Sequence, residues 1–330
     1  MKILYVISGE TGFKNTDEKI LQSIGQVTKI NFHYFSILKV LKYIFNSYSS
    51  EAIIIWFASK HAIPAALLQY VYKRNLIIIA GGYDVANVSS IRYGNMRKGY
   101  KRYIGQWILS KAKYVIAVSK SNFDEILNNA LVHPNKVKLV YNAINLKVSN
   151  YKYQKINQVL TVGEINEETY LRKGLDRVIK LAKLMPDKNF LHIGKWTNKS
   201  GSVCTKTINR IKENSPSNLT FLGYLKRKEL IDYYKNSKYY LQLSRHEAFG
   251  VSVIEAMSYG CIPIVSRAYA LPEIVGENGY IVDSLSDITK IFESESNISA
   301  KYVNPKSLIK YSINRRKNSL EKIMKSSFQS

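Results

Sequence analysis

The chain has 330 residues, a formal net charge of +25 and an apolar fraction of 46%. At roughly 100–200 residues per domain, this length predicts two domains, and the composition is typical of a folded globular protein. The two cysteines lie far apart and no cluster of cysteine and histidine occurs, so a disulfide framework or a structural zinc site is not expected. No apolar run approaches the ~18 residues of a membrane-spanning helix, and the first residues predict a strand and a turn instead of a signal peptide. We therefore expect a cytoplasmic protein.

The positive charge has two interpretations. A charge of this size attracts polyanions or an anionic membrane surface, but it also follows from a composition rich in lysine. Residues 1–150 carry a net charge of +13, and the rest of the chain carries +12. The charge is spread over both halves, so it marks no single nucleic-acid-binding domain.

Short apolar runs alternate with amphipathic segments through the first half of the chain. These runs predict strands at 3–7, 52–57, 75–81, 113–119 and 137–142, and the spacing at 63–73 predicts a helix. Continuous apolar strands joined by helices are typical of parallel sheets covered on both faces. The pattern predicts a doubly wound α/β domain.

A polar segment at 143–157 predicts a linker that divides the chain into domains 1–146 and 147–330. The alternation then restarts, with strands expected at 159–163, 189–194, 219–225, 238–244 and 262–266 and helices at 174–185, 205–215 and 228–237. The stretch 294–299 predicts a loop. The segment 307–325 predicts a terminal basic helix that either stays with the second domain or packs back on the first. Two such domains should leave a central cleft lined by the carboxyl ends of their strands.

The stretch HEAFGVSVIEAMSYG (246–260) places two carboxylates eight residues apart. On one helix they would lie ~12 Å apart along the axis and on different faces, so they do not form a close catalytic pair. Gly250 favours a loop that ends there, with a helix beginning near residue 251. Glu247 would then lie in the loop and Glu255 one turn inside the helix, whose free N–H groups suit a phosphate. In the alternative, Ser244 and Glu247 form a helix capping box and Glu255 is merely solvated.

This stretch, extended to HEAFGVSVIEAMSYGCIPIVS, resembles the signature of retaining GT-B glycosyltransferases of family 4. Three further segments match that family in the right order: VSKSNFDEIL with NKVKLVYNAIN (118–145), TVGEI to LHIGK (161–195) and LPEIVGENGYIVD (271–283). Together they cover most of residues 113–283. The resemblance implies two Rossmann-like domains and retaining transfer of a sugar from a UDP- or GDP-sugar to a lipid-linked, glycan or other acceptor, without a cofactor or bound metal.

The resemblance also implies roles for residues of the second domain. Glu255 would bind the nucleotide ribose, and Glu247 would contact the donor sugar near the reacting carbon. Backbone amides at Phe249 and Gly250 would help to hold the sugar and phosphates. Lys173, with Arg172 beside it, would bind the diphosphate and stabilise the charge that develops on it. The chain departs from the family at Glu164, where an arginine is common.

The first domain carries the acceptor side in this family. Many members place a histidine after a central strand of this domain, whereas this chain has the sequence GGYDVA there. Asp84 is therefore the candidate catalytic group, although an aspartate after two glycines is also common in turns. His61 is either a cleft residue or a structural one. Gly9 and Gly12 follow the first strand and suit a tight loop near the cleft.

The segment MRKGYKRYIGQWILSKAK (96–113) is a basic stretch with an aromatic and aliphatic face. In GT-B enzymes that act on lipid-linked acceptors, a helix of this kind docks on the bilayer. Lys101, Arg102 and Trp107 are therefore candidate contacts with the inner face of the membrane. Alternatively, the apolar face is core and the charges are a solvated face.

Three other functions stay open at this stage. The charge is compatible with a nucleic-acid-binding protein that reuses the fold, or with transfer of a sugar to a nucleic acid. The motifs are also compatible with another GT-B enzyme, such as a sugar-nucleotide epimerase. The sequence does not reveal the donor sugar, its base or the acceptor.

Overall fold

The computed structural model describes residues 1–330 except 34–35, 73, 147–152, 198–204, 295–302 and 327–330. The chain divides into two compact units, one formed by residues 1–145 and 310–330 and the other by residues 146–309. The terminal basic helix therefore belongs to the first unit. Residues 295–299 of the expected loop and residues 147–152 of the expected linker lie outside the described residues.

The first unit contains a parallel sheet with the strand order β2-β1-β3-β4-β5-β6. Its strands are β1 (Lys2–Ile7), β2 (Gln26–Asn31), β3 (Ala52–Trp56), β4 (Asn75–Ala80), β5 (Tyr114–Ala117) and β6 (Val137–Leu139). The central strands are continuous apolar runs because helices cover both of their faces. The edge strand β2 has mixed composition and buries only Ile30 fully, and the apolar pattern of the sequence did not predict it.

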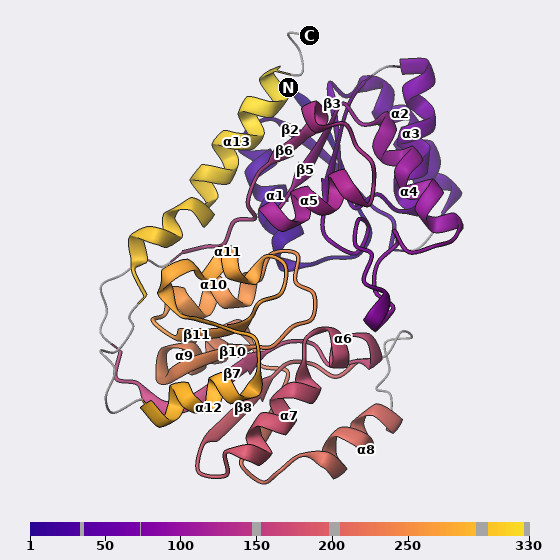
Figure 1. Cartoon of the computed structure of the whole chain (residues 1–330). Coiled ribbons are helices and arrows are strands. Elements are labelled where there is room, and N and C mark those ends of the chain that lie inside the picture. Colours follow the sequence, from indigo (N-terminus) through magenta and orange to yellow (C-terminus); the bar gives the residue numbers. More distant parts are fainter. Residues whose placement is uncertain (34–35, 73, 147–152, 198–204, 295–302, 327–330) are drawn as a thin grey trace. The chain divides into compact units, whose positions relative to one another are not determined.

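Helices cover both faces of this sheet (Figure 1). They are α1 (Gly12–Gln22), α2 (Ile37–Ser49), α3 (Ile63–Tyr72), α4 (Tyr100–Lys111), α5 (Lys120–Asn128) and α13 (Ile313–Ser326). One large core joins buried residues of α2, α3, α4 and α5 to the sheet, and α1 and α13 contact each other on the opposite face. There the Arg316 guanidinium donates two hydrogen bonds, of 2.5 and 2.6 Å, to the buried carboxylate of Asp17, which ties the end of the chain to its beginning.

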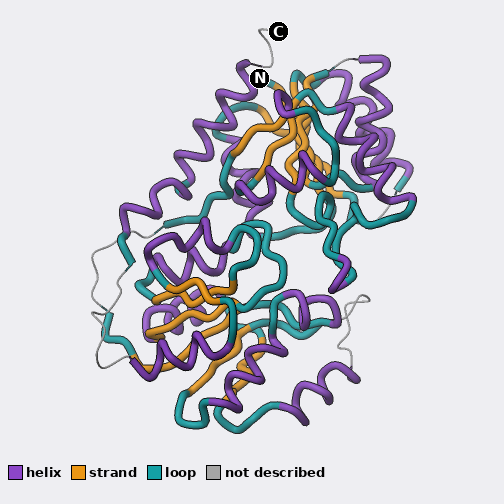
Figure 2. Tube along the Cα trace, viewed as in Figure 1, coloured by secondary structure: helices purple, strands orange, loops and turns teal. Residues whose placement is uncertain are grey.

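The second unit repeats this architecture with the order β12-β11-β10-β7-β8-β9. Its strands are β7 (Ile156–Val162), β8 (Asn189–Ile193), β9 (Leu219–Gly223), β10 (Ser237–Gln242), β11 (Ile262–Ser266) and β12 (Tyr280–Val282). Its helices are α6 (Glu167–Arg172), α7 (Leu175–Leu184), α8 (Thr205–Asn214), α9 (Arg227–Asn236), α10 (Val251–Ser258), α11 (Leu271–Val275) and α12 (Leu285–Glu293). Figure 2 shows the strands of each unit as a group bordered by helices. The prediction of doubly wound α/β architecture is confirmed.

The strand orders identify where each unit is suited to bind a ligand. In doubly wound sheets, ligands bind outside the carboxyl ends of the strands at the point where the strand order reverses. This point lies between β7 and β10 in the second unit and between β1 and β3 in the first. The loop that contains Glu247 follows β10 directly, so the fold and the sequence motif indicate the same edge.

Candidate functional site

The loop between β10 and α10 has the predicted layout. Helix α10 begins at Val251, and Gly250 precedes it with a φ of +93°, a conformation that side chains with a Cβ rarely adopt. Glu247 therefore lies in the loop, and Glu255 lies one turn inside the helix. The capping-box alternative is wrong, because α10 begins well after Ser244 and has no side-chain cap. The Ser244 hydroxyl instead accepts a hydrogen bond of 2.6 Å from the Gln242 amide.

Glu247 forms an ion pair with Lys173. The Lys173 Nζ donates a hydrogen bond of 2.9 Å to Oε2 of Glu247, and only 13% of the Glu247 side chain is exposed. Burial raises the pKa of the Glu247 carboxyl, but the positive charges of Lys173 and Arg172 outweigh this effect and leave its pKa below the ordinary value. The site therefore holds a buried carboxylate in its charged form beside an ammonium group.

Lys173 lies at the junction of α6 and α7, and the backbone fixes its position. Gly174, which follows it, has a φ of +74°, and a Cβ added there would lie 1.9 Å from the carbonyl oxygen of Leu243. Only glycine permits this approach between the helix junction and the end of β10. The junction is therefore pressed against the loop that contains Glu247.

Arg245 locks the same two segments together, a role that sequence reasoning missed. Its backbone N–H donates to the carbonyl of Arg172 at 2.7 Å, and its guanidinium donates two hydrogen bonds, of 2.7 and 2.6 Å, to the carboxylate of Asp176. Two parallel hydrogen bonds fix the orientation of the guanidinium relative to the carboxylate as well as the distance between them. The partners lie 69 residues apart, so no local spacing indicates the contact.

Glu255 is paired with a cation rather than simply solvated. The guanidinium of Arg227, at the start of α9, donates a hydrogen bond of 2.5 Å to Oε1 of Glu255. The Glu255 side chain is 15% exposed, whereas that of Arg227 is 51% exposed. The carboxylate is thus fixed from one side by a half-exposed cation. Arg227 is a second residue that sequence reasoning missed.

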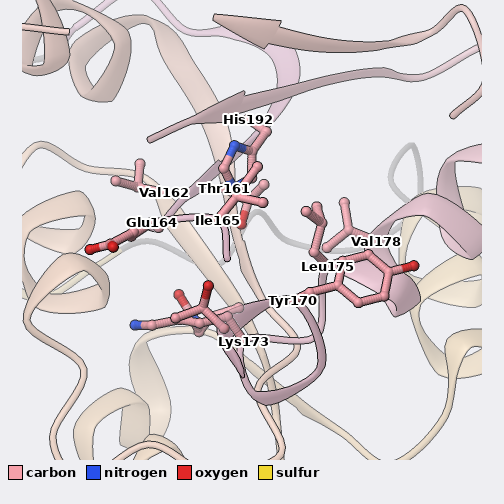
Figure 3. Close-up of a pocket in the computed structure, with 12 residues that line it drawn as sticks. Thr161, Val162, Glu164, Ile165, Tyr170, Lys173, Leu175, Val178 and His192 are labelled. Atoms are coloured by element: carbon pink, nitrogen blue, oxygen red, sulfur yellow. The ribbon is translucent and has the colours of Figure 1, made fainter. Parts of the chain in front are cut away.

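Glu164 stands directly after β7, on the other side of the reversal point. Its carboxylate accepts hydrogen bonds from the Thr197 hydroxyl and, at 3.3 Å, from the Asn166 amide. Figure 3 shows the charged ends of Glu164 and Lys173 at the same side of a pocket that both residues line. His192 lines this pocket as well, and burial lowers its pKa to about 4, so the imidazole is neutral at physiological pH. The departure from the family motif therefore places an acid, not a base, beside the pocket.

Two further contacts shape the loop that contains Glu247. The Ala270 N–H donates to the carbonyl of Glu247 at 3.1 Å, and the rings of His246 and Tyr269 lie 4.2 Å apart. Phe249 is buried, so its ring anchors the loop while its backbone amide stays in the turn before α10. These contacts connect the loop to the segment that follows β11.

In the first unit, the loop after β1 is held by a buried lysine. Lys14 Nζ donates hydrogen bonds to the carbonyls of Ser8 and Gly9 at 2.8 and 3.0 Å, and burial lowers its pKa to about 8. Gly9 has a φ of +73°, and its N–H donates to the Asn31 side chain at 3.0 Å. Gly12 is the first residue of α1. The two glycines thus lie at the reversal point of this sheet, as their position after β1 requires.

The loops after β3 and β4 are packed against each other. Phe57 has a φ of +72°, which is rare for a residue with a side chain, and a Cβ added at Gly81 would lie 1.9 Å from its ring. Asp84 is fully buried, and its carboxylate accepts hydrogen bonds from the backbone N–H groups of Ala58, Gly81 and Gly82 at 2.9 to 3.1 Å. Burial raises the pKa of Asp84 to about 6, although these amides lower it in part. The bonds of Asp84 join two loops, and its expected catalytic role stays a prediction.

The other first-unit candidates have structural contacts. His61 has a ring nitrogen 2.7 Å from the carbonyl oxygen of Trp56, and burial lowers its pKa to about 4. Trp107 is partly buried against the core, and Ile108 is fully buried. These contacts favour the alternative in which the apolar face of α4 packs on the core, and the expected membrane contact of Trp107 stays a prediction. Lys101 is exposed and Arg102 is half-buried on the same helix.

The described part of the chain has neither a metal-binding cluster nor a membrane-spanning helix. Within it, no group of three or more histidine, cysteine, aspartate or glutamate side chains is arranged to hold a metal ion. Among the helices that the structure describes, none is long and apolar enough to cross a membrane.

Known proteins resemble this chain in sequence and in fold. An uncharacterised 41.2 kDa protein of the cps region of Klebsiella pneumoniae is 28% identical over 206 residues, which are 58% of this chain and 53% of that protein. The alpha-galactosylglucosyldiacylglycerol synthase of Streptococcus pneumoniae is 29% identical over 124 residues, which are 38% of this chain and 32% of the synthase. The match therefore spans at most about half the length of these curated relatives.

The structure of the Anabaena protein HepE in complex with UDP and glucose has the same fold, with a TM-score of 0.77 and 14% identity over 99% of this chain and 100% of that one. The family model described as glycosyl transferases group 1 matches residues 142–312, the segment that contains Lys173, Glu247 and Glu255. The chain belongs to the group 1 glycosyl transferases and has their GT-B fold of two Rossmann-like domains.

Proposed function

We propose that this protein is a retaining glycosyltransferase that uses a nucleotide-diphosphate sugar as donor. The observation that carries the proposal is the ion pair of Lys173 and Glu247 beside the first turn of α10. It brings a cation of the α6–α7 junction next to a charged carboxylate and the N-terminal N–H groups of α10. These are the groups that a diphosphate and a sugar with developing positive charge require.

The donor nucleotide would lie across the reversal point of the second sheet. Glu255 would accept hydrogen bonds from the ribose hydroxyls, with Arg227 holding its carboxylate. Lys173 and Arg172 would contact the diphosphate, helped by the amides of Phe249 and Gly250. The Anabaena protein, which has the same fold, was crystallised in complex with UDP and glucose, and this supports a donor of the same class. A UDP-sugar and a GDP-sugar both fit these contacts, because none of them reads the base.

The chemical step would break the bond between the anomeric carbon and the diphosphate oxygen. The bonding electron pair goes to that oxygen, and Lys173 stabilises the resulting negative charge. The sugar gains oxocarbenium character, which the negative charge of Glu247 favours. The acceptor hydroxyl oxygen bonds to the anomeric carbon on the face that the diphosphate leaves, and its proton passes to the departing diphosphate oxygen. No group in this scheme requires a bound metal.

The acceptor side is assigned to the first unit, where Gly9, Gly12 and Asp84 lie around the reversal point of the sheet. Because the Asp84 carboxylate is bonded to three backbone amides, we propose that it acts mainly by fixing the loops after β3 and β4. A lipid-linked or glycan acceptor is the class that the family suggests. Family membership favours this function over the nucleic-acid-binding alternative.

A transfer assay with labelled UDP- and GDP-sugars tests the proposal. Wild-type protein should release nucleoside diphosphate in the presence of acceptor, and NMR of the product should show retained anomeric configuration. Lys173→Ala should reduce turnover about 10²-fold or more, because a group that stabilises the leaving diphosphate is lost. The control is Lys183→Ala, an exposed lysine in the last turn of α7, which should behave as wild type.

Two outcomes of these assays would contradict the proposal. Equal turnover of the Lys173→Ala and Lys183→Ala proteins would remove Lys173 from the reaction. Binding of DNA or RNA with a steep salt dependence, together with no sugar transfer, would instead support the nucleic-acid-binding alternative.

A further inference from the structure

Helix α2 presents its apolar side chains outward. Leu38 is 76% exposed and Phe45 is 74% exposed, whereas the helix buries Tyr43 and Ser47. A helix on the surface of a globular protein normally buries its apolar stripe and exposes its polar one. The arrangement of α2 is the reverse of this pattern, so its outer stripe is suited to something other than the core of its own unit.

The exposed apolar surface continues across two neighbouring helices. Helix α2 packs against α3, and α3 packs against α4, so the three lie in a row on one face of the first sheet (Figure 1). We call their exposed side chains the outer helix face. Its apolar and aromatic members are Ile37, Leu38, Leu41, Ile44, Phe45, Tyr48, Leu67, Tyr70, Val71, Tyr100 and Tyr103. So many large exposed apolar side chains on adjacent elements mark an interaction surface.

The charged side chains on the three helices of the outer helix face all have the same sign. From Lys19 to Phe123 the chain has 15 lysine and arginine residues but only two acids, Glu51 and Asp84. Asp84 is buried, and Glu51 lies before β3, where its carboxylate accepts a hydrogen bond from the N–H of Lys2. Helices α2, α3 and α4 contain no acid at all. The surface is therefore apolar, aromatic and strongly basic at once.

Some of these cations lie directly beside the aromatic rings. The Lys111 ammonium lies 4.2 Å from the centre of the Tyr70 ring, and the Arg74 guanidinium lies 5.8 Å from that of Tyr48. Lys42 and Lys101 are exposed on α2 and α4. Aliphatic and aromatic side chains with adjacent lysine and arginine are the composition that binds the interface of an anionic bilayer.

We propose that the outer helix face binds the surface of membranes that contain anionic phospholipids. Leu38, Leu41 and Phe45 would enter the boundary of headgroups and acyl chains, and the surrounding cations would bind the anionic headgroups. The positive charge of this face favours an anionic membrane over a second copy of the chain, because two such basic faces would repel each other. Membrane contact is thereby assigned to the exposed side chains of α2, α3 and α4, whereas Trp107 is partly buried against the core. This assignment does not depend on the proposed transferase activity.

The test is flotation of the full chain with two kinds of vesicle in about 0.1 M salt. One kind contains phosphatidylcholine alone, and the other contains phosphatidylcholine with 30 mol% phosphatidylglycerol. Wild type should float with the anionic vesicles and much less with the neutral ones. The double variant Leu41→Ser/Phe45→Ser should lose at least about 10-fold in affinity for the anionic vesicles. The control Leu184→Ser/Tyr224→Ser removes two exposed apolar side chains of the second unit and should bind as wild type.

A second pair of variants separates the charge from the apolar contact. Lys42→Glu/Lys101→Glu should weaken binding, whereas Lys180→Glu/Lys183→Glu, which changes the charge of the second unit equally, should weaken it much less. All four residues are exposed, so thermal unfolding should stay close to that of wild type, and this is measured for each protein.

Three results would overturn the proposal. The first is no flotation of wild type with anionic vesicles. The second is equal flotation of Leu41→Ser/Phe45→Ser and its control, which would leave only diffuse electrostatic attraction. The third is a dimeric wild type that Leu41→Ser/Phe45→Ser converts to a monomer without loss of vesicle binding, which would make the face a contact between copies of this chain.

Discussion

The carboxylates at the carboxyl edges of the two sheets, Glu247 and Asp84, are held in opposite ways. Glu247 of the second unit is satisfied by a side-chain cation, Lys173, and its pKa is lowered. Asp84 of the first unit is satisfied by three backbone amides, and its pKa is raised to about 6. An ion pair of side chains can rearrange around a ligand, whereas bonds to the backbone hold loops. We therefore assign reaction chemistry to the edge of the second sheet and loop positioning to that of the first.

The cations at the carboxyl edges of the two sheets also differ in the kind of group that they bind. Lys14 donates to backbone carbonyls of the loop after β1, and burial lowers its pKa to about 8. Arg227 pairs with the carboxylate of Glu255 and is half-exposed. At the edge of the first sheet the charged Lys14 is therefore bonded to the backbone, whereas at the edge of the second sheet the charged Arg227 is exposed to solvent. Four predictions test this difference.

The largest effect is expected for Glu247→Gln. The substitution keeps the size of the side chain but removes the negative charge beside Lys173, so turnover should fall about 10³-fold, which is about 4 kcal/mol, while nucleotide binding changes little. Steady-state kinetics and calorimetric titration of the nucleotide check this. The control is Glu277→Gln, an exposed glutamate of the same unit. Full activity of Glu247→Gln would show that turnover does not need the negative charge of Glu247.

The next effect concerns the helix junction that carries Lys173. Gly174→Ala should reduce the free energy of unfolding by about 3 kcal/mol, because the new Cβ would lie 1.9 Å from the carbonyl oxygen of Leu243. Gly223→Ala is the matched control, since Gly223 also has a positive φ, +70°, but no atom within 4 Å of the added Cβ. Chemical denaturation of both proteins separates the cost of the clash from that of the dihedral angle. An equal loss in both would show that close packing is not what fixes the junction.

Asp84 predicts a pH dependence of stability. Its pKa is about 6 in the folded protein and about 3.8 when unfolded, so between these values the native state binds more protons. The free energy of unfolding of wild type relative to Asp84→Asn should therefore fall, by on the order of 2 to 3 kcal/mol, as the pH rises from about 4 to about 6. Denaturant titrations across this range check the sign. Asp124→Asn, at an exposed aspartate, should show no such difference.

The smallest effect is expected for Arg227→Ala. Loss of the partner should leave the Glu255 carboxylate less well oriented, and affinity for the nucleotide should fall about 5-fold, or about 1 kcal/mol, since Arg227 is half-exposed. Titration with UDP and with GDP measures this and also compares the two bases. The adjacent exposed lysine gives the control Lys228→Ala. Unchanged affinity for both nucleotides would contradict a role for the pair in orienting Glu255.

Much of this protein follows from the sequence alone. Apolar strands alternate with amphipathic helices, as in folds built on a parallel sheet that helices cover, so the α/β class and the central strands are predictable. The segment from Glu247 to Glu255 is also local, because Gly250 ends a loop and starts a helix whatever the rest of the chain does. The edge strand β2 was missed because an edge position does not demand a continuous apolar run.

Tertiary structure decided what depends on contacts between distant residues. The pairs of Arg245 with Asp176 and of Arg227 with Glu255 join residues 69 and 28 positions apart, so no spacing in the sequence reveals them. Helical periodicity shows that α2 and α4 each have an apolar face, but not which face meets the sheet. Packing buries that face in α4 and exposes it in α2, because the position of each helix on the sheet fixes which side is covered.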